Sequence, residues 1–277
     1  MKTILVPTDF SKCANNALRY AAELNKTLNA RILVFHSYHV PVPATDIPID
    51  LKTEAELKKG ALKSLQDLKI TYSQKYPGMQ FLVETSSGFA DDEIITRVGK
   101  EQCDYVVMGT HGSSGLREFL LGSNTTTVME KATCPVFAVP EDAVFNGLGQ
   151  VVFAADYGMH NYDNVLKVIE LIKPFNSEIT LLHIRIGKLD EFLEYSELEG
   201  FKNRVVEESK YSRISFSLID HTDVYQGMNT FTEEAKPSLL VLSMRNRSFV
   251  EKIFSRSITK RMAHHGHTPL LVFHIGS

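Results

Sequence analysis

The chain has 277 residues, 43% of them hydrophobic and 23% charged, with a formal net charge of −3 at pH 7. These values predict a soluble globular protein of one or two domains, without a general attraction to nucleic acid or to an acidic membrane surface. The sequence opens without a signal-peptide pattern and has no apolar run of about 20 residues, so we expect a cytoplasmic protein. The three cysteines lack CxxC spacing and are expected to be reduced: Cys13, Cys103 and Cys134.

Four segments of the first half recur in the second half. The pairs are residues 4–10 with 151–157, 32–36 with 179–183, 105–108 with 239–242, and 134–139 with 268–273. The first two pairs are 147 positions apart and the last two are 134 positions apart. Shared offsets predict two copies of one domain, at residues 1–140 and 150–277, joined by a linker at 141–149.

The change of offset predicts that the second copy lost a net 13 residues after its second strand. The Pro-rich segment 39–48 of the first copy is the expected extra material. His36 and His183 are expected at equivalent strand ends, as structural histidines.

Within each half, short β-branched runs alternate with segments whose apolar residues recur every three or four positions. Near-continuous apolar strands such as residues 32–35 suit a parallel sheet that is covered by helices on both faces. The predicted fold is therefore α/β, with two tandem doubly wound parallel five-stranded sheets. In such sheets ligands bind beyond the carboxyl ends of the strands.

A glycine-rich segment follows the predicted fourth strand and precedes a helix expected over residues 125–132. Its spacing is G-x2-G-x9-G-[ST], at Gly109, Gly112, Gly122 and Ser123. Glycines without a Cβ let backbone amides approach an anion, and a helix start adds its positive dipole end. The spacing is neither that of a P-loop nor that of a dinucleotide-binding fold.

With this spacing, and with the strand endings at residues 6–11 and 35–37, the chain resembles the universal stress protein family in its tandem form. The resemblance covers essentially the whole sequence and implies an adenine nucleotide alpha hydrolase-like fold that binds ATP with Mg²⁺. The nucleotide-binding residues that it implies are Pro7, Thr8, Asp9, Ser37, Met108, Gly109, Gly112, Gly122, Ser123 and Asn124. Among these, Ser123 would lie beside the metal ion.

Two assignments have simpler alternatives. Asp9 could be a helix N-cap instead of a ligand, although Ser11 could fill that role equally well. His111 could touch a phosphate or point to solvent. The neighbouring carboxylates Asp91 and Asp92 are expected at a helix start, where negative charge suits the helix dipole.

The second copy carries side chains where the first copy has the three glycines: Ser243, Asn246 and Arg256. We therefore expect no ATP binding there, although a different anion site remains open because basic residues crowd this region: Arg245, Arg247, Lys252, Arg256 and Lys260. The histidines at 264, 265 and 267 are expected to be a polar helix end, because nothing pairs with them at metal-ligand spacing.

The leading functional hypothesis is an ATP-binding stress or regulatory protein with slow or no hydrolysis. The alternatives are a weak ATPase or phosphotransferase, and a nucleotide-free dimerisation scaffold. The resemblance also implies that the two domains pair through their last strands, at residues 136–139 and 270–273, and a homodimer is possible.

Overall fold

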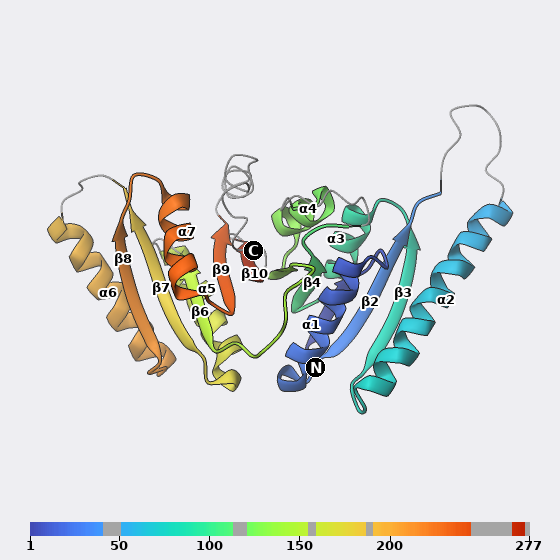
Figure 1. Ribbon diagram of the computed structural model, residues 1–277, viewed down its shortest axis with the longest axis horizontal. Coiled ribbons are helices and arrows are strands. Elements are labelled where there is room, and N and C mark those ends of the chain that lie inside the picture. The colour runs from blue at the N-terminus through green and yellow to red at the C-terminus, as the bar shows by residue number, and fades with distance from the viewer. Residues whose placement is uncertain (41–50, 113–120, 155–158, 187–190, 245–267, 275–277) are drawn as a thin grey trace. The chain divides into compact units, whose positions relative to one another are not determined.

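The computed structural model of the protein describes residues 1–40, 51–112, 121–154, 159–186, 191–244 and 268–274. The chain divides into two compact units, and the boundary between them follows Glu141. Strands and helices alternate along the first unit, and along the second unit up to residue 244 (Figure 1).

The first unit contains five strands and four helices among its described residues. They are β1 (Thr3–Pro7), α1 (Lys12–Leu28), β2 (Arg31–Tyr38), α2 (Leu51–Lys75), β3 (Phe81–Ser87), α3 (Ala90–Lys100), β4 (Tyr105–Gly109), α4 (Ser123–Lys131) and β5 (Val136–Val139). The strands lie in the order β3-β2-β1-β4-β5 and every neighbouring pair is parallel.

The second unit repeats this order of elements as far as its fourth strand, and residues 245–267, before its last strand, lie outside the described residues. Its elements are β6 (Gln150–Ala154), α5 (Met159–Ile172), a 3₁₀ turn η1 (Lys173–Phe175), β7 (Glu178–Arg185), α6 (Glu191–Ser209), β8 (Ile214–Asp220), α7 (Val224–Ala235), β9 (Leu239–Met244) and β10 (Leu270–His274). The strand order is β10-β9-β6-β7-β8, again parallel throughout. The predicted fold class is therefore confirmed.

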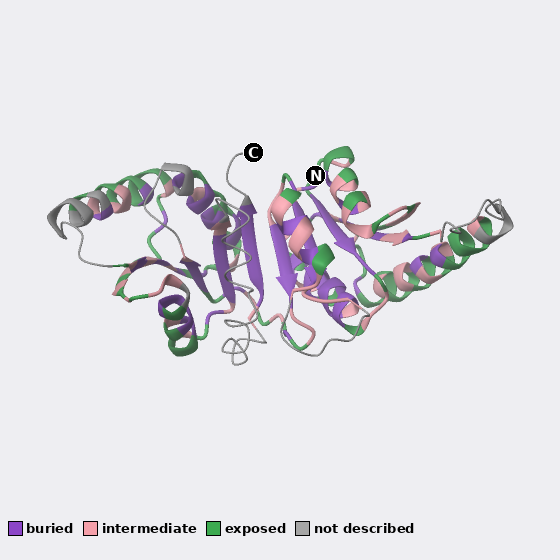
Figure 2. Cartoon of the chain, turned by 90° about the horizontal axis from the view of Figure 1, so that it is seen from above, coloured by how far each residue is buried: buried purple, intermediate pink, exposed green. Residues whose placement is uncertain are grey.

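The strands β1, β4 and β5 of the first unit are buried because helices cover both faces of the sheet. Right-handed crossovers carry α1 and α2 to one face, and α3 and α4 to the other, because the chain changes direction across the sheet after β3. Accordingly, α1 contacts β1, β4 and β5, whereas α3 contacts β2 and α4. All residues of β1, β4 and β5 are buried, as Figure 2 shows in purple.

The observed strands follow the predicted repeat. β1 and β6 begin 147 positions apart, as do β2 and β7, while β4 and β9 begin 134 positions apart. The second unit is shorter between its second and third strands, and part of this difference lies in the helices, because α2 has 25 residues and α6 has 19. Residues 41–48 of the predicted Pro-rich insertion lie outside the described residues.

Two of the local predictions concern the starts of helices α3 and α4. Asp91 and Asp92 lie in the first turn of α3, as expected. The helix predicted over residues 125–132 begins earlier, at Ser123, with Gly122 as its N-cap. The exact domain limits and the pairing of the two last strands stay predictions.

In the described part of the chain, none of the helices combines the length and the apolar character needed to cross a bilayer.

Candidate functional site

The strand order of the first unit reverses between β1 and β4. β1 pairs with β2 on one side and with β4 on the other. In an open parallel sheet a crevice opens beyond the carboxyl ends of such a strand pair. Pro7 ends β1, and Met108 and Gly109 end β4, so the segments that follow them border this crevice.

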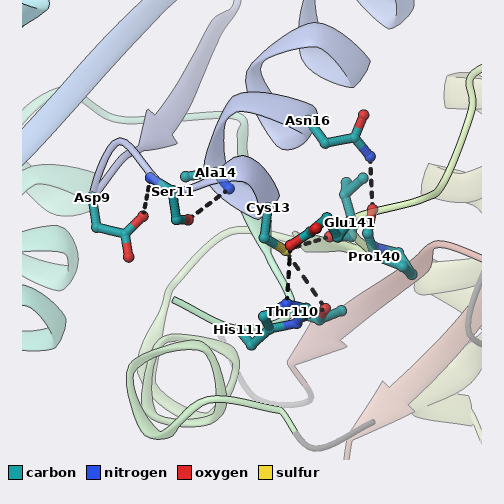
Figure 3. A network of polar contacts seen from close by, with 10 residues as sticks. Asp9, Ser11, Cys13, Ala14, Asn16, Thr110, His111, Pro140 and Glu141 are labelled. Carbon is teal, nitrogen blue, oxygen red and sulfur yellow. Dashed lines mark hydrogen bonds and ion pairs between the residues drawn. The ribbon is translucent and has the colours of Figure 1, made fainter. Parts of the chain in front are cut away.

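The segment after β1 is a tight turn that leads into α1. The Thr8 amide donates to the Phe35 carbonyl (2.8 Å), and the Phe10 amide donates to Thr8 Oγ1 (3.0 Å). Asp9 Oδ1 accepts the Ser11 amide (3.0 Å), and Ser11 Oγ accepts the Ala14 amide (3.2 Å), as Figure 3 shows. Ser11 is therefore the N-cap of α1, and Asp9 is not.

The three glycines of the motif have different surroundings. A Cβ on Gly109 would lie 2.7 Å from Cys13 Sγ and 3.1 Å from the Cys13 carbonyl carbon. A Cβ on Gly112 would lie 2.8 Å from Asp9 Oδ2. A Cβ on Gly122 would have only ordinary contacts, the nearest 3.5 Å from the His111 Cα. A side chain at Gly109 would therefore conflict with α1, whereas a side chain at Gly112 would displace the Asp9 carboxylate.

The start of α4 lies beside the end of β4. Thr125 Oγ1 donates to the Gly109 carbonyl (2.9 Å), which fastens the helix to the strand. The Gly122 amide already donates to the Thr110 carbonyl (2.7 Å), so it does not offer a free N–H in this conformation. Ser123 and Asn124 are exposed in the first helical turn, where backbone amides lack intrahelical acceptors. Among the residues that the structure describes, no side chain caps this end of α4.

At the end of β2, polar side chains tie neighbouring strands together. Ser37 Oγ donates to the Gly88 carbonyl (2.6 Å). Because this bond occupies the side chain, the backbone of Ser37 is the group expected to contact a base. His36 Nδ1 donates to the Thr8 carbonyl (2.7 Å), the structural role expected for this histidine. Pro7 pairs with Phe35 and Ala154 pairs with Leu182, so His36 and His183 occupy equivalent positions, as predicted.

His111 has a partner that neither sequence interpretation foresaw. Its Nε2 lies 3.4 Å from Glu141 Oε2, and its Nδ1 lies 3.1 Å from Thr110 Oγ1. Figure 3 shows this contact with Glu141 within the first unit, and a phosphate contact of His111 stays a prediction. Residues 113–120, which complete the glycine-rich segment, lie outside the described residues.

The same segment is fastened to the last strand. The Thr110 amide donates to the Val139 carbonyl (3.1 Å), and Cys13 Sγ lies 3.5 Å from that carbonyl. Asn16 Nδ2 donates to the next carbonyl, that of Pro140 (2.7 Å). Cys13 is fully buried, and burial raises the pKa of its thiol, which disfavours the reactive thiolate.

In the second unit a side chain fills the position of Gly109. Ser243 lies near the end of β9, and its Oγ accepts a hydrogen bond from Asn164 Nδ2 (2.8 Å). Asn164 is 5% exposed and belongs to α5, the equivalent of α1. The remaining second-copy residues named from the sequence lie outside the described residues: Arg245, Asn246, Arg247, Lys252, Arg256, Lys260, His264, His265 and His267.

Sequence reasoning missed two residues of the Asp9 turn. Phe10 has a φ of +63°, and Asn15 Nδ2 donates to its carbonyl (3.2 Å). No local pattern in the sequence marks a phenylalanine for the left-handed region, which is uncommon for any residue with a Cβ.

Among the described residues, no group of three or more His, Cys, Asp or Glu side chains could hold a metal ion. The three cysteines are free thiols. The site therefore consists of a carboxylate, glycine backbone and an uncapped helix start.

This fold and this crevice define a doubly wound α/β protein with a candidate ligand site at its topological switch point. The model of the universal stress protein family matches residues 1–140. A universal stress protein of Methanocaldococcus jannaschii is 30% identical over 141 residues, which are 50% of this chain and 81% of the relative. Universal stress protein A homolog 1 of Coxiella burnetii is 34% identical over 142 residues, or 50% of this chain and 95% of the relative. The chain belongs to the universal stress protein family.

One solved structure extends the likeness to both units. A universal stress protein from Archaeoglobus fulgidus aligns with 99% of this chain and 97% of its own, with a TM-score of 0.74 and 21% identity. At this identity the likeness concerns the fold alone. It agrees with the tandem arrangement predicted from the internal repeat.

Proposed function

We propose that the first unit binds ATP and that binding, with slow or no hydrolysis, is its activity. The observation that carries this proposal is the arrangement at the switch point, where the Asp9 carboxylate faces Gly112 and the first turn of α4 begins beside the same glycine. An uncapped helix N-terminus favours phosphate because its amides and its dipole both attract anions. The carboxylate at the other side of the crevice can accept hydrogen bonds from ribose hydroxyls.

The proposed contacts follow the order of the elements around the crevice. Pro7, Thr8 and Asp9 line the adenosine end, and the backbone at Ser37 contacts the base. Met108 and Gly109 pack on the ribose. The phosphate end consists of Gly112, Gly122, Ser123 and Asn124. For Gly122 this requires its amide to exchange the Thr110 carbonyl for a phosphate oxygen, at the cost of one backbone hydrogen bond.

Mg²⁺ in this proposal is held mainly by the nucleotide. Ser123 contributes one hydroxyl, and the remaining ligands would be phosphate oxygens and water, the usual arrangement for this ion. The ion would neutralise phosphate charge. If so, ATP binds more weakly after chelation of divalent ions, while adenosine binding is unchanged.

Slow turnover follows from the chemistry of the described residues. Phosphoryl transfer needs a group that orients the attacking water and cationic groups that stabilise the transition state. In the described part of the glycine-rich segment, the His111 imidazole lies beside the Glu141 carboxylate (3.4 Å). Amides alone bind phosphate in the ground state without positioning water.

The test compares ATP with adenosine in the variant Gly122→Asp. An Asp at this N-cap should stabilise α4, so the fold is retained, but it competes for the helix amides and repels phosphate. We expect calorimetric titration to show ATP affinity about a hundredfold lower, because charge-assisted hydrogen bonds contribute about 1.5–3 kcal/mol each. Adenosine affinity should change less than about threefold, since it lacks the phosphates.

Gly60→Asp is the matched control, because it adds the same side chain to α2 at a position with nothing within 4 Å. If wild-type protein binds neither ligand, the proposal is wrong and a nucleotide-free scaffold is favoured. ADP formation that disappears in Gly122→Asp would favour the ATPase alternative instead.

A further inference from the structure

The residue after Asp9 has a backbone conformation that a phenylalanine rarely adopts. Phe10 has a φ of +63°, in the left-handed region, where its Cβ crowds the backbone. Strained residues of this kind persist only where surrounding contacts hold them, and they cluster at functional sites. Phe10 lies between the proposed ribose ligand Asp9 and the helix cap Ser11.

Three contacts hold Phe10 in this conformation. Its amide donates to Thr8 Oγ1 (3.0 Å), and its carbonyl accepts from Asn15 Nδ2 (3.2 Å). Its ring lies against the imidazole of His36, with centroids 4.7 Å apart. The strained residue is thus fixed from the strand side by Thr8 and His36, and from the helix side by Asn15.

The conformation of Phe10 determines where the Asp9 carboxylate lies. With the chain turned at Phe10, the Ser11 amide reaches back to Asp9 Oδ1 (3.0 Å). The second oxygen, Oδ2, is then held next to Gly112, within 2.8 Å of the point where a Cβ would stand. The exposed Asp9 carboxylate is therefore oriented by the Ser11 amide, with its second oxygen beside Gly112.

We infer that Phe10 and Asn15 are positioning residues of the ligand site, which hold the Asp9 carboxylate ready to accept a ribose hydroxyl. The inference rests on the proposed function, because it assigns these two residues to the same site. Preorganisation of an acceptor raises affinity because the ligand does not have to order the turn.

One feature of Asn15 distinguishes a positioning role from a role in stability alone. Among the described residues its Oδ1 is buried and has no hydrogen-bond partner. Loss of the Asn15 side chain removes one hydrogen bond and also one unpaired buried acceptor, so the two effects on folding oppose each other. A residue kept only for stability would not carry this unpaired oxygen.

The first test uses a matched pair at Phe10. Both Phe10→Gly and Phe10→Val lose the ring contact with His36, but only glycine adopts positive φ without strain, whereas a β-branched residue resists it. We expect Phe10→Gly to bind adenosine within about threefold of wild type, and Phe10→Val to bind about tenfold more weakly than Phe10→Gly. Adenosine is the probe because it contains no phosphate.

The second test is Asn15→Ala, with the exposed Lys12→Ala in the same helix as control. Adenosine affinity should fall about fivefold for Asn15→Ala, the worth of one hydrogen bond, while the urea midpoint of the ligand-free protein stays close to wild type. All titrations are made where far-UV circular dichroism shows every variant folded.

The outcomes separate the two proposals. Equal adenosine affinity of Phe10→Val and Phe10→Gly, in a wild-type protein that binds adenosine, would overturn the positioning role alone. A fall in the urea midpoint of Asn15→Ala without loss of affinity would make Asn15 merely structural. Wild-type protein that binds neither adenosine nor ATP would overturn the proposed function, and this inference with it.

Discussion

Gly112 and Asp9 face each other so closely that no side chain fits between them: a Cβ on Gly112 would lie 2.8 Å from Asp9 Oδ2. The two residues are 103 positions apart in sequence and belong to the segments that follow β4 and β1. The missing side chain of Gly112 therefore accommodates the Asp9 carboxylate, and it would also let the Gly112 amide approach a phosphate.

For Gly112→Ala, we expect the new methyl group to displace the Asp9 carboxylate, which is the far end of a short side chain and can rotate away. The free energy of unfolding should fall by less than about 1 kcal/mol, while ATP affinity falls about tenfold. Urea unfolding and calorimetry measure the two quantities. Gly99→Ala is the control, since its Cβ meets nothing within 4 Å in α3; an unchanged ATP affinity in Gly112→Ala would contradict the proposed role of this contact.

For Gly109→Ala, the expected defect is in folding. The added Cβ would lie 2.7 Å from Cys13 Sγ and 3.1 Å from the Cys13 backbone, which cannot move away as a flexible side chain could. Such overpacking costs about 1–3 kcal/mol, measurable by urea unfolding. The double variant Gly109→Ala, Cys13→Ala should recover only part of this loss, because the backbone contact remains. Full recovery would show that the sulfur alone causes the conflict.

In the second unit, Ser243→Ala should leave Asn164 Nδ2 without its hydrogen-bond partner. Asn164 is 5% exposed, so the unpaired group should cost about 1–3 kcal/mol of unfolding free energy. The variant Ser243→Gly should be similarly destabilised and should gain no second nucleotide site. A stoichiometry of two ATP per chain in Ser243→Gly would mean that Ser243 alone blocks the second site.

The thiols should be unreactive in the folded protein. Burial raises the pKa of Cys103 to about 11 and that of Cys134 to about 12, from an ordinary value of 9.0. Because the thiolate is the reactive form, iodoacetamide at pH 8 should modify these cysteines slowly in the native protein and rapidly in urea. Mass spectrometry of the labelled peptides gives the rates.

The same pKa changes predict how stability depends on pH. The folded state holds these thiol protons more tightly than the unfolded chain does. The associated stability is therefore fully present below pH 9 and is lost as the pH rises toward 11 and 12. An unfolding free energy that rose over this range would contradict the assignment, and a Cys103→Ser, Cys134→Ser variant should show a shallower decline.

The repeat, the fold class and the strand positions could be read from the sequence. Apolar periodicity and turn residues are local properties, and the internal repeat doubled the information for four of the five strands of each unit, but it did not locate β3 and β8. The helix after Gly122 was expected too, although its start was displaced to Ser123, because the Thr125 side chain bonds to Gly109 and not to the helix end.

The contacts inside the site were decided by the tertiary structure. His111 with Glu141, Gly109 with Cys13, and Ser243 with Asn164 join residues that are 30, 96 and 79 positions apart. Phe10 adopts its left-handed conformation because Thr8, Asn15 and His36 hold it, against its own preference. By itself, the sequence determined which elements form and at which strand ends a ligand site could lie. Only the packed chain decided which side chains meet there, because those contacts depend on distances between segments that no local pattern encodes.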